Sequence, residues 1–331
     1  MNGTQQLLDG FGRRITYLRL SLTDRCDFRC TYCMSEKMEF MPRSEILSLE
    51  ECLLIAKVFV ESGVSKIRLT GGEPLVRKDM LWLAQRIRKL DGLRELTLTT
   101  NGSQLARMAS PLAQAGMDRI NISLDSLDPE SFHHITRTGN LHQVLSGIDA
   151  AITAFGSRRI KLNTVVQRDV NLHELPALVQ FALQNAVDIS FIEQMPLGKT
   201  GQRIADSFFS NQELLEQLSQ RFEMIPSIEN SGGPAHYWRI PRHETRIGFI
   251  SPHTRNFCAD CNRMRVTARG ELFPCLGNEN KVDLMGPARA GDEAALRSLI
   301  LQAVAAKPYG HQFDLSRNEP QIVRFMSHTG G

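Results

Sequence analysis

Two groups of three cysteines carry the clearest chemistry in the sequence. The first group is Cys26, Cys30 and Cys33, in a C-x3-C-x2-C array, and the second group is Cys258, Cys261 and Cys275. Thiolates are soft ligands that suit zinc, Cu(I) or iron–sulfur clusters. Structural zinc sites and simple [4Fe–4S] carriers use four protein ligands. A triplet with no fourth cysteine beside it therefore indicates a metal site with one open coordination position.

The segment that follows the second cysteine pair indicates a preference for anions. Arg263 and Arg265 lie two residues apart on an expected extended segment, so their side chains point the same way. Guanidinium groups bind phosphate or a purine through forked hydrogen bonds. A zinc site completed by His253 or His236 remains an alternative for this triplet. For the first triplet, the alternatives are a zinc loop and an electron-transfer cluster.

A third motif, Gly71-Gly72-Glu73-Pro74, follows an apolar segment that is expected to be a strand. Two glycines let the backbone approach a ligand closely, and the carboxylate can accept a hydrogen bond from an ammonium group. A surface turn would explain these four residues equally well if they stood alone.

These motifs fall at the ends of a regular series of elements. Alternating or apolar segments predict strands at 15–21, 66–70, 95–100, 119–125, 159–166 and 188–193. Helices are expected after the capping box at Ser48, near 78–90 and 103–115, from Asp128, and at 141–155 and 172–186. This alternation predicts an α/β fold with a parallel sheet and right-handed crossovers. In such a sheet, ligands bind at the carboxyl ends of the strands, where the motifs lie.

The series is too short for an eight-fold barrel, so we expect an incomplete (βα)6 partial TIM barrel, with a doubly wound sheet as the alternative. This barrel would occupy residues 1–205. Residues 206–331 would form a C-terminal α+β domain that carries the second triplet. Ser210 caps one more helix, and from Ser231 the sequence is strand-like and rich in turn residues.

Composition narrows the class of protein. The chain has 331 residues, 42% of them hydrophobic and 23% charged, with a formal net charge of +3. These values are typical of a soluble globular protein and give no reason to expect nucleic-acid or membrane binding. Because six of the seven cysteines lie in the two triplets, a reducing compartment is the better interpretation than a disulfide framework. We therefore expect a cytoplasmic metalloprotein.

Taken together, the motifs resemble a known family. The first triplet, with Tyr32 before its last cysteine, is similar to the cluster loop of radical S-adenosylmethionine (SAM) enzymes. The full set adds G-G-E-P, the C-x2-C-N-R-x-R segment, Cys275 in P-C-L and the terminal Gly330-Gly331. This set resembles the GTP 3′,8-cyclase (MoaA-type) family, lyases that begin molybdenum cofactor biosynthesis, from about Arg13 to the C-terminus.

The resemblance implies two [4Fe–4S] clusters, one per triplet, and SAM as cofactor. The cluster of Cys26, Cys30 and Cys33 would bind SAM and generate a 5′-deoxyadenosyl radical that removes the 3′ hydrogen of GTP. The ribose radical would attack C8, giving (8S)-3′,8-cyclo-7,8-dihydroguanosine 5′-triphosphate. The cluster of Cys258, Cys261 and Cys275 would hold the guanine.

By the same resemblance, the SAM contacts would be Tyr32, Gly72, Glu73, Ser123 and Met195. The GTP contacts would be Arg19, Arg68, Thr99, Lys161, Arg263, Met264 and Arg265, with Arg19, Arg263 and Arg265 catalytic. The implied partners are GTP, a reductant such as flavodoxin or ferredoxin, and the cyclic pyranopterin monophosphate synthase that receives the product. The chain would act as a monomer or homodimer.

Some features depart from the family pattern or leave other functions open. Ser190 stands where the family commonly has an arginine that helps hold the triphosphate, and Lys66 is a candidate to compensate. Ser35 replaces a common proline, and Cys52 is expected to be an inert core thiol. The alternatives are another radical SAM enzyme with an auxiliary cluster, such as a peptide-modifying one, or a non-catalytic iron–sulfur or zinc protein.

Overall fold

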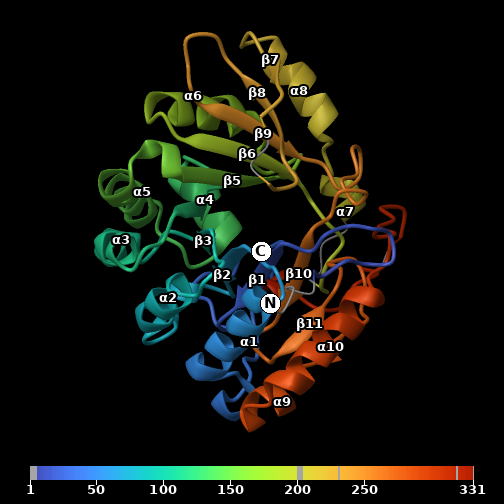
Figure 1. Ribbon diagram of the computed structural model, residues 1–331. Helices are drawn as coiled ribbons and strands as arrows, with labels where there is room; N and C mark the ends of the chain where they lie inside the picture. Colours follow the sequence, from blue (N-terminus) through green and yellow to red (C-terminus); the bar gives the residue numbers. More distant parts are fainter. Residues whose placement is uncertain (1–5, 200–203, 230–231, 318–319, 331) are drawn as a thin grey trace.

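The structure, a computed structural model, describes residues 6–199, 204–229, 232–317 and 320–330. Parallel strands lie side by side in chain order in one curved sheet (Figure 1). They are β1 (Tyr17–Ser21), β2 (Lys66–Thr70), β3 (Glu95–Thr100), β4 (Arg119–Ser123), β5 (Ile160–Val166) and β6 (Asp188–Glu193). The predicted partial (βα)6 barrel is confirmed.

Helices connect these strands and cover the outer face of the sheet (Figure 1). They are α1 (Leu49–Glu61), α2 (Met80–Arg88), α3 (Leu105–Gln114), α4 (Pro129–Thr136), α5 (Leu141–Phe155) and α6 (Leu175–Gln184). Short 3-10 turns lie at Arg43–Glu45, Pro74–Val76, Ser157–Arg159 and Leu172–Glu174. Local sequence explains several of the starts. Ser48 forms a capping box with Glu51, and Asp128 accepts a hydrogen bond from the Ser131 N–H.

Alternation along the strands gives the sheet an apolar face and a polar face. In β1 and β2, Leu18, Leu20, Ile67 and Leu69 are fully buried in the hydrophobic core. Arg19 lies between the two leucines of β1 and therefore projects to the opposite, inner face. The inner face of the barrel is thus the one that carries charged side chains.

The C-terminal part of the chain extends both edges of the same sheet. Strand β10 (Arg263–Val266) pairs in parallel with β1, and β9 (Arg246–Ile250) pairs in parallel with β6. The outer strands β7 (Ile225–Ser227), β8 (His236–Arg239), β11 (Glu271–Phe273) and β12 (Val282–Asp283) are antiparallel to their neighbours. Because the sheet continues across residue 205, the division into domains 1–205 and 206–331 stays a prediction.

The remaining helices are α7 (Ile204–Ser207), α8 (Asn211–Ser219), α9 (Met285–Ala290), α10 (Glu293–Ala305) and α11 (Met326–Thr329). The prediction of a strand-like segment from Ser231 onward is wrong for α9 and α10, which pack beside α1 (Figure 1). The local signal was Asp292, whose carboxylate accepts a hydrogen bond from the Ala295 N–H and begins α10.

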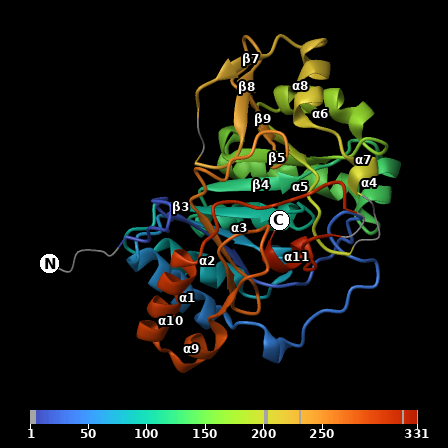
Figure 2. The same cartoon turned by 90° about the vertical axis from the view of Figure 1, so that its right-hand side faces the viewer.

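Helix α11 lies in the middle of the molecule (Figure 2) and packs against β1. The last described residues therefore lie inside the barrel region. Within the described ranges, no helix has both the length and the apolar character needed to cross a membrane.

Candidate active site

The first cysteine triplet lies in the loop after β1, at the carboxyl ends of the strands. Cys26, Cys30 and Cys33 all line one cavity there, which we call the first cavity. Two backbone hydrogen bonds fasten the loop to α4. The Arg29 N–H donates to the Thr136 carbonyl (2.9 Å), and the Thr31 N–H donates to the Ile135 carbonyl (2.9 Å). The βα order thus holds three thiols on one wall of the first cavity.

The glycine pair after β2 lines the same cavity and packs against the chain just before the first cysteine. The Gly72 N–H donates to the Thr23 carbonyl (2.7 Å). A Cβ atom at Gly71 would lie 2.6 Å from the Thr23 carbonyl oxygen, and one at Gly72 would lie 2.4 Å from that of Arg25. Only glycine therefore allows the two loops to meet here.

Glu73 occupies a different position from the one its motif predicts. Its side chain is fully buried, and its carboxylate accepts hydrogen bonds from the Leu75 N–H (2.9 Å), the Thr100 hydroxyl (2.8 Å) and the Asn101 N–H (2.6 Å). Burial raises its pKa to about 7, although these bonds act in the opposite direction. The structure does not bring this carboxylate to the first cavity. Instead, Glu73 ties the glycine loop to the end of β3.

Three of the other predicted SAM contacts, Tyr32, Ser123 and Met195, line the first cavity. The Tyr32 hydroxyl donates to Asp125 Oδ2 (2.7 Å), and the Val165 N–H donates to Asp125 Oδ1 (2.8 Å). Burial raises the pKa of Asp125 to about 6. Asp125 is a cavity residue that the sequence analysis missed, although it stands at the end of a predicted strand. It orients Tyr32 within the cavity.

Two further side chains indicate that the first cavity suits a polar ligand. Among the described residues, Thr70 Oγ1 and Asn163 Oδ1 are buried without a hydrogen-bond partner. Both residues line the cavity. A buried polar atom without a partner costs roughly 1–3 kcal/mol, which a ligand donor would recover.

Arginines on neighbouring strands form the wall of a second cavity. The sheet register places Arg265 of β10 beside Arg19 of β1, and Arg19 beside Arg68 of β2. All three line the second cavity, together with Arg263 and Tyr17. The predicted cationic cluster is therefore assembled by strands that are distant in the sequence.

The charges in this cluster repel one another. Burial lowers the pKa of Arg19 to about 10; the charges of Arg68 and Arg263 also lower it, and Tyr17 partly offsets them. Burial and the charges of Arg19 and Arg263 hold the pKa of Arg265 well below its usual range. Burial would raise the pKa of Tyr17, but the charges of Arg68, Arg19 and Lys66 lower it to about 7. An anionic ligand would relieve this repulsion.

Other predicted substrate residues divide between the cavity and the core. Thr99 and Lys161 line the second cavity. Met264 does not: it is fully buried in the hydrophobic core, because alternation along β10 turns it away from Arg263 and Arg265. Its predicted substrate contact is not supported for the side chain. Lys66 and Arg119 also line this cavity, and the sequence analysis did not assign Arg119.

The second triplet lines the same cavity as the arginines. Its members are Cys258, Cys261 and Cys275. The loop is held from two directions by buried cations. Arg13 Nη1 donates to the Cys258 carbonyl (2.7 Å) and its Nη2 donates to the Pro308 carbonyl (2.7 Å). Lys307 Nζ donates to the Arg263 carbonyl (2.9 Å). Neither anchoring residue was identified from the sequence.

The zinc alternative gains no support from the two histidines that it named. His253 Nε2 lies 3.0 Å from the Gln194 carbonyl oxygen, and neither His253 nor His236 is among the residues that line the second cavity. In the part of the chain that the structure describes, no group of three or more His, Cys, Asp or Glu side chains is arranged to hold a metal ion, and this applies to both cysteine triplets as well.

The two cavities adjoin. Five residues line both: Thr99, Asn163, Ile192, Met195 and Met326. A ligand in the first cavity can therefore face a ligand in the second across this common boundary.

The C-terminal segment also enters this region. Arg265 Nη1 donates to the Gly330 carbonyl (2.6 Å), and Arg19 Nη2 lies 3.3 Å from the same oxygen. A Cβ atom at Gly330 would lie 1.9 Å from Thr70 Oγ1. Gly331, the other member of the terminal pair, lies outside the described residues.

The types of donor, rather than a preformed coordination geometry, fit the implied groups. Three thiols line each cavity, and thiolates are the protein ligands of iron–sulfur clusters. Iron binds thiolates. Burial raises the pKa of Cys33 to about 12. For Cys261, burial is outweighed by the charges of Arg263 and Lys307, which lower its pKa to about 7. Arg263 and Lys307 thus favour the ionised form of Cys261, whereas burial raises the pKa of Cys275.

Comparisons with known proteins agree with this geometry. A family model described as the Radical SAM superfamily matches residues 20–182, and one described as Molybdenum Cofactor Synthesis C matches residues 187–313. A GTP 3′,8-cyclase of Pseudomonas entomophila is 55% identical over 331 residues, covering 99% of this chain and 98% of that protein. A GTP 3′,8-cyclase of Saccharophagus degradans is 51% identical over 328 residues, with 98% of each chain covered.

Solved structures share the fold at low sequence identity. Streptococcus suis SuiB bound to S-adenosylmethionine superimposes with a TM-score of 0.64 at 16% identity, covering 95% of this chain and 77% of that one. The same protein bound to its precursor peptide SuiA gives a TM-score of 0.61 at 15% identity, with 95% and 76% covered. The fold is thus that of radical SAM proteins, whereas the full-length relatives determine the family. The chain belongs to the GTP 3′,8-cyclase family of radical SAM enzymes.

Proposed function

We propose that this chain carries out the reaction of its family at the boundary between the two cavities. The substrate is GTP, and the product is (8S)-3′,8-cyclo-7,8-dihydroguanosine 5′-triphosphate, the first intermediate of molybdenum cofactor biosynthesis. The observation that carries the proposal is the adjoining pair of cavities, each with its own cysteine triplet and the second lined by arginines. Ligands held in the two cavities would face each other across the residues that line both.

Residues of the first cavity hold SAM. Cys26, Cys30 and Cys33 ligate a [4Fe–4S] cluster. When bound, cluster and SAM together supply the 5′-deoxyadenosyl radical. Tyr32, fixed by Asp125, and the backbone at Gly72 orient SAM, and Ser123 and Met195 complete the contacts.

Residues of the second cavity hold GTP. Cys258, Cys261 and Cys275 ligate a second [4Fe–4S] cluster beside the guanine. The cations that neutralise the triphosphate are Arg19, Arg68, Lys161, Arg263 and Arg265, because guanidinium and ammonium groups form strong charge-assisted hydrogen bonds to phosphate. Arg19, Arg263 and Arg265 also surround the reacting nucleoside, and Thr99 lies at the boundary.

The partners follow from this chemistry. A one-electron reductant such as flavodoxin or ferredoxin would reduce the first cluster. The product would pass to the cyclic pyranopterin monophosphate synthase. We place both encounters in the cytoplasm, with the enzyme acting as a monomer or homodimer.

The test is anaerobic reconstitution followed by reduction and incubation with SAM and GTP. Mass spectrometry measures 5′-deoxyadenosine and the cyclised nucleotide in the same sample. Cys30→Ser should abolish both products. Cys275→Ser should retain some 5′-deoxyadenosine and lose the cyclised nucleotide. Cys52→Ala is the matched control, because Cys52 is buried in the core outside both cavities.

Iron content gives an independent readout. The wild type should bind about eight iron atoms, as two [4Fe–4S] clusters require, and either cysteine variant about four. Formation of 5′-deoxyadenosine with unchanged GTP would contradict the cyclase proposal. If Cys275→Ser lost both products equally, the second triplet would also be required for SAM cleavage. Its role would then not be confined to holding the nucleotide.

A further inference from the structure

Arg119, at the start of β4, is a cation of the second cavity without an assigned role. Its strand register places it beside Thr97 of β3, and the alternation of β4 directs it to the inner face with Asn121. Its side chain is 23% exposed, so the guanidinium group is largely shielded from solvent. Charge-assisted hydrogen bonds are stronger in such a setting than at the surface.

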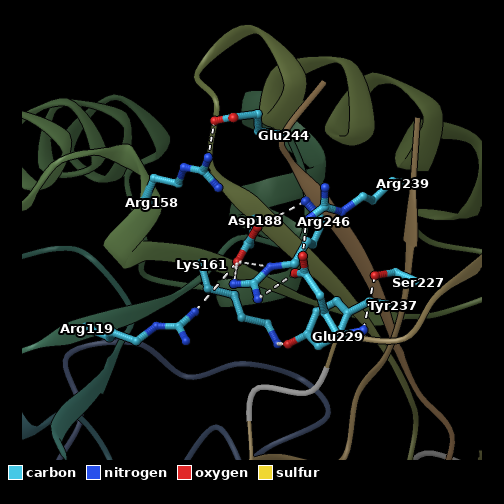
Figure 3. Close-up of polar contacts among 10 residues, drawn as sticks. All are labelled: Arg119, Arg158, Lys161, Asp188, Ser227, Glu229, Tyr237, Arg239, Glu244 and Arg246. Carbon is cyan, nitrogen blue, oxygen red and sulfur yellow. Dashed lines mark hydrogen bonds and ion pairs between the residues drawn. The ribbon is translucent and has the colours of Figure 1, made fainter. Parts of the chain in front are cut away.

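Arg119 is held only loosely by its acidic neighbour. Its Nη2 lies 3.6 Å from Asp188 Oδ2, which is beyond hydrogen-bond distance (Figure 3). Arg246 satisfies Asp188 by itself: its N–H donates to Oδ1 (3.0 Å), its Nε donates to Oδ2 (3.1 Å), and its Nη2 also bonds Oδ2. Asp188 would therefore stay paired if Arg119 turned toward a ligand.

A second cation lies near Arg119 on the next strand. Lys161 Nζ donates to the Tyr237 hydroxyl (3.0 Å), and Figure 3 shows Lys161 and Arg119 projecting from neighbouring strands into the same region. Burial lowers the pKa of Lys161; Tyr237 and the charge of Asp188 partly offset this effect, and the charge of Arg119 lowers the pKa further. Two cations that repel each other on one cavity wall would both be stabilised by a shared anion.

The neighbouring strand β6 offers no cation at its inner position. Ser190 is fully buried. A Cβ atom added at Gly248 would lie 2.4 Å from the Ser190 hydroxyl oxygen and 2.9 Å from the Tyr237 ring. Tyr237 and the Gly248 backbone thus crowd the space beside Ser190. On this side, the cations that line the second cavity are Arg119 of β4 and Lys161 of β5.

We propose that Arg119 binds the polyphosphate of the nucleotide, turning from Asp188 to donate two hydrogen bonds to phosphate oxygens beside Lys161. This inference rests on the proposed function, because it takes GTP as the ligand of the second cavity. It makes Arg119 a determinant of specificity for the triphosphate over shorter nucleotides.

The test is an equilibrium binding series of GTP, GDP and guanosine with the reconstituted holoenzyme, in the absence of SAM so that no turnover occurs. Arg119→Gln should weaken GTP binding about 10- to 100-fold, as expected for the loss of hydrogen bonds between charged groups. Guanosine affinity should change less than threefold. Arg119→Lys should recover part of the loss, because lysine keeps the charge but not the forked geometry.

Arg158→Gln is the matched control. Arg158, in the turn before β5, forms an exposed ion pair with Glu244 (Figure 3) and does not line the second cavity. It should leave all three affinities unchanged. Unchanged thermal unfolding and iron content of Arg119→Gln would show that its fold and clusters are intact.

The outcomes separate the two claims. If the wild type binds GTP no more tightly than guanosine, a triphosphate site in this cavity is wrong, and the proposed function loses its support. A second outcome is that the wild type prefers GTP, but Arg119→Gln weakens the binding of GTP and guanosine equally or changes neither affinity. In that case the polyphosphate role of Arg119 is wrong and the proposed function stands.

Discussion

Replacing Gly330 with alanine tests whether the C-terminal segment is locked into the active-site region. Gly330 has a φ of 76°, in the left-handed region. Alanine there costs roughly 1–2 kcal/mol. Its Cβ would also lie 1.9 Å from Thr70 Oγ1, an atom of a buried side chain on β2. It would also lie 2.6 Å from Thr70 Cβ, so rotation of the hydroxyl group alone does not relieve the clash and the segment must shift.

The size of the effect follows from the hydrogen bond that this shift would break. The Gly330 carbonyl accepts a 2.6 Å hydrogen bond from Arg265, and a hydrogen bond to a charged group contributes roughly 1.5–3 kcal/mol. Together with the backbone cost, Gly330→Ala should destabilise the docked segment by about 2.5–5 kcal/mol. At 1.4 kcal/mol per tenfold change, its opening should become at least about 60-fold more frequent.

Hydrogen–deuterium exchange of peptides covering 320–330 measures this opening. Amide exchange in α11 should accelerate at least about 60-fold in Gly330→Ala, while exchange in α1 and α5 stays unchanged. Gly291→Ala is the matched control. Gly291 also has a positive φ of 67°, but no atom lies within 4 Å of its added Cβ, so it reports the backbone cost alone.

Unchanged exchange of α11 in Gly330→Ala would refute the reasoning, because it would mean that the segment is not held by the contact with Thr70 and Arg265. Equal acceleration in Gly291→Ala would refute it as well. That outcome would assign the effect to general destabilisation of the fold.

Two further predictions concern groups that hold the loops of the site. Because the folded pKa of Glu73, about 7, lies above its reference value of 4.5, its protonated form favours folding. This contribution is complete at low pH and is lost as the pH rises through about 7. We measure the free energy of unfolding by urea for the apoprotein and for Glu73→Gln. The wild type should exceed the variant by more at pH 5 than at pH 8. An excess that grows with pH would contradict the raised pKa of Glu73. Arg13→Gln should release the second triplet loop and destabilise the fold by about 2–4 kcal/mol, since its guanidinium donates to the carbonyls of Cys258 and Pro308 from a buried position. Iron content should fall while 5′-deoxyadenosine formation persists, and loss of iron from both triplets alike would show that the effect is not local.

The sequence predicts elements and motifs well where local rules decide them. The capping box at Ser48 begins α1, and Asp128 with Pro129 begins α4, as expected. Strand alternation places the side chains of Arg263 and Arg265 on the same face of β10. The same rule turns the Met264 side chain into the core, although the resemblance to the family implied a GTP contact for it.

The sequence could not predict the positions of side chains that are fixed by partners far away in the chain. Glu73 turns inward because Thr100 and Asn101, at the end of another strand, donate to it. Arg13 anchors a loop some 245 residues away. The inner position of Arg119 depends on which strands flank β4 and on how Arg246 occupies Asp188.

The pairing of β10 with β1 has a consequence for the synthesis of the protein. Strand β1 is among the first elements to leave the ribosome, yet its parallel partner on this side begins at Arg263. At about 5–20 residues per second, the roughly 250 intervening residues take on the order of 10–50 s to emerge. During that interval the nascent barrel carries an open parallel edge at β1, and later another at β6 until β9 arrives. Exposed edges of this kind invite pairing with other chains. Ribosome-associated chaperones would therefore be needed most between the completion of β6 and the arrival of β10.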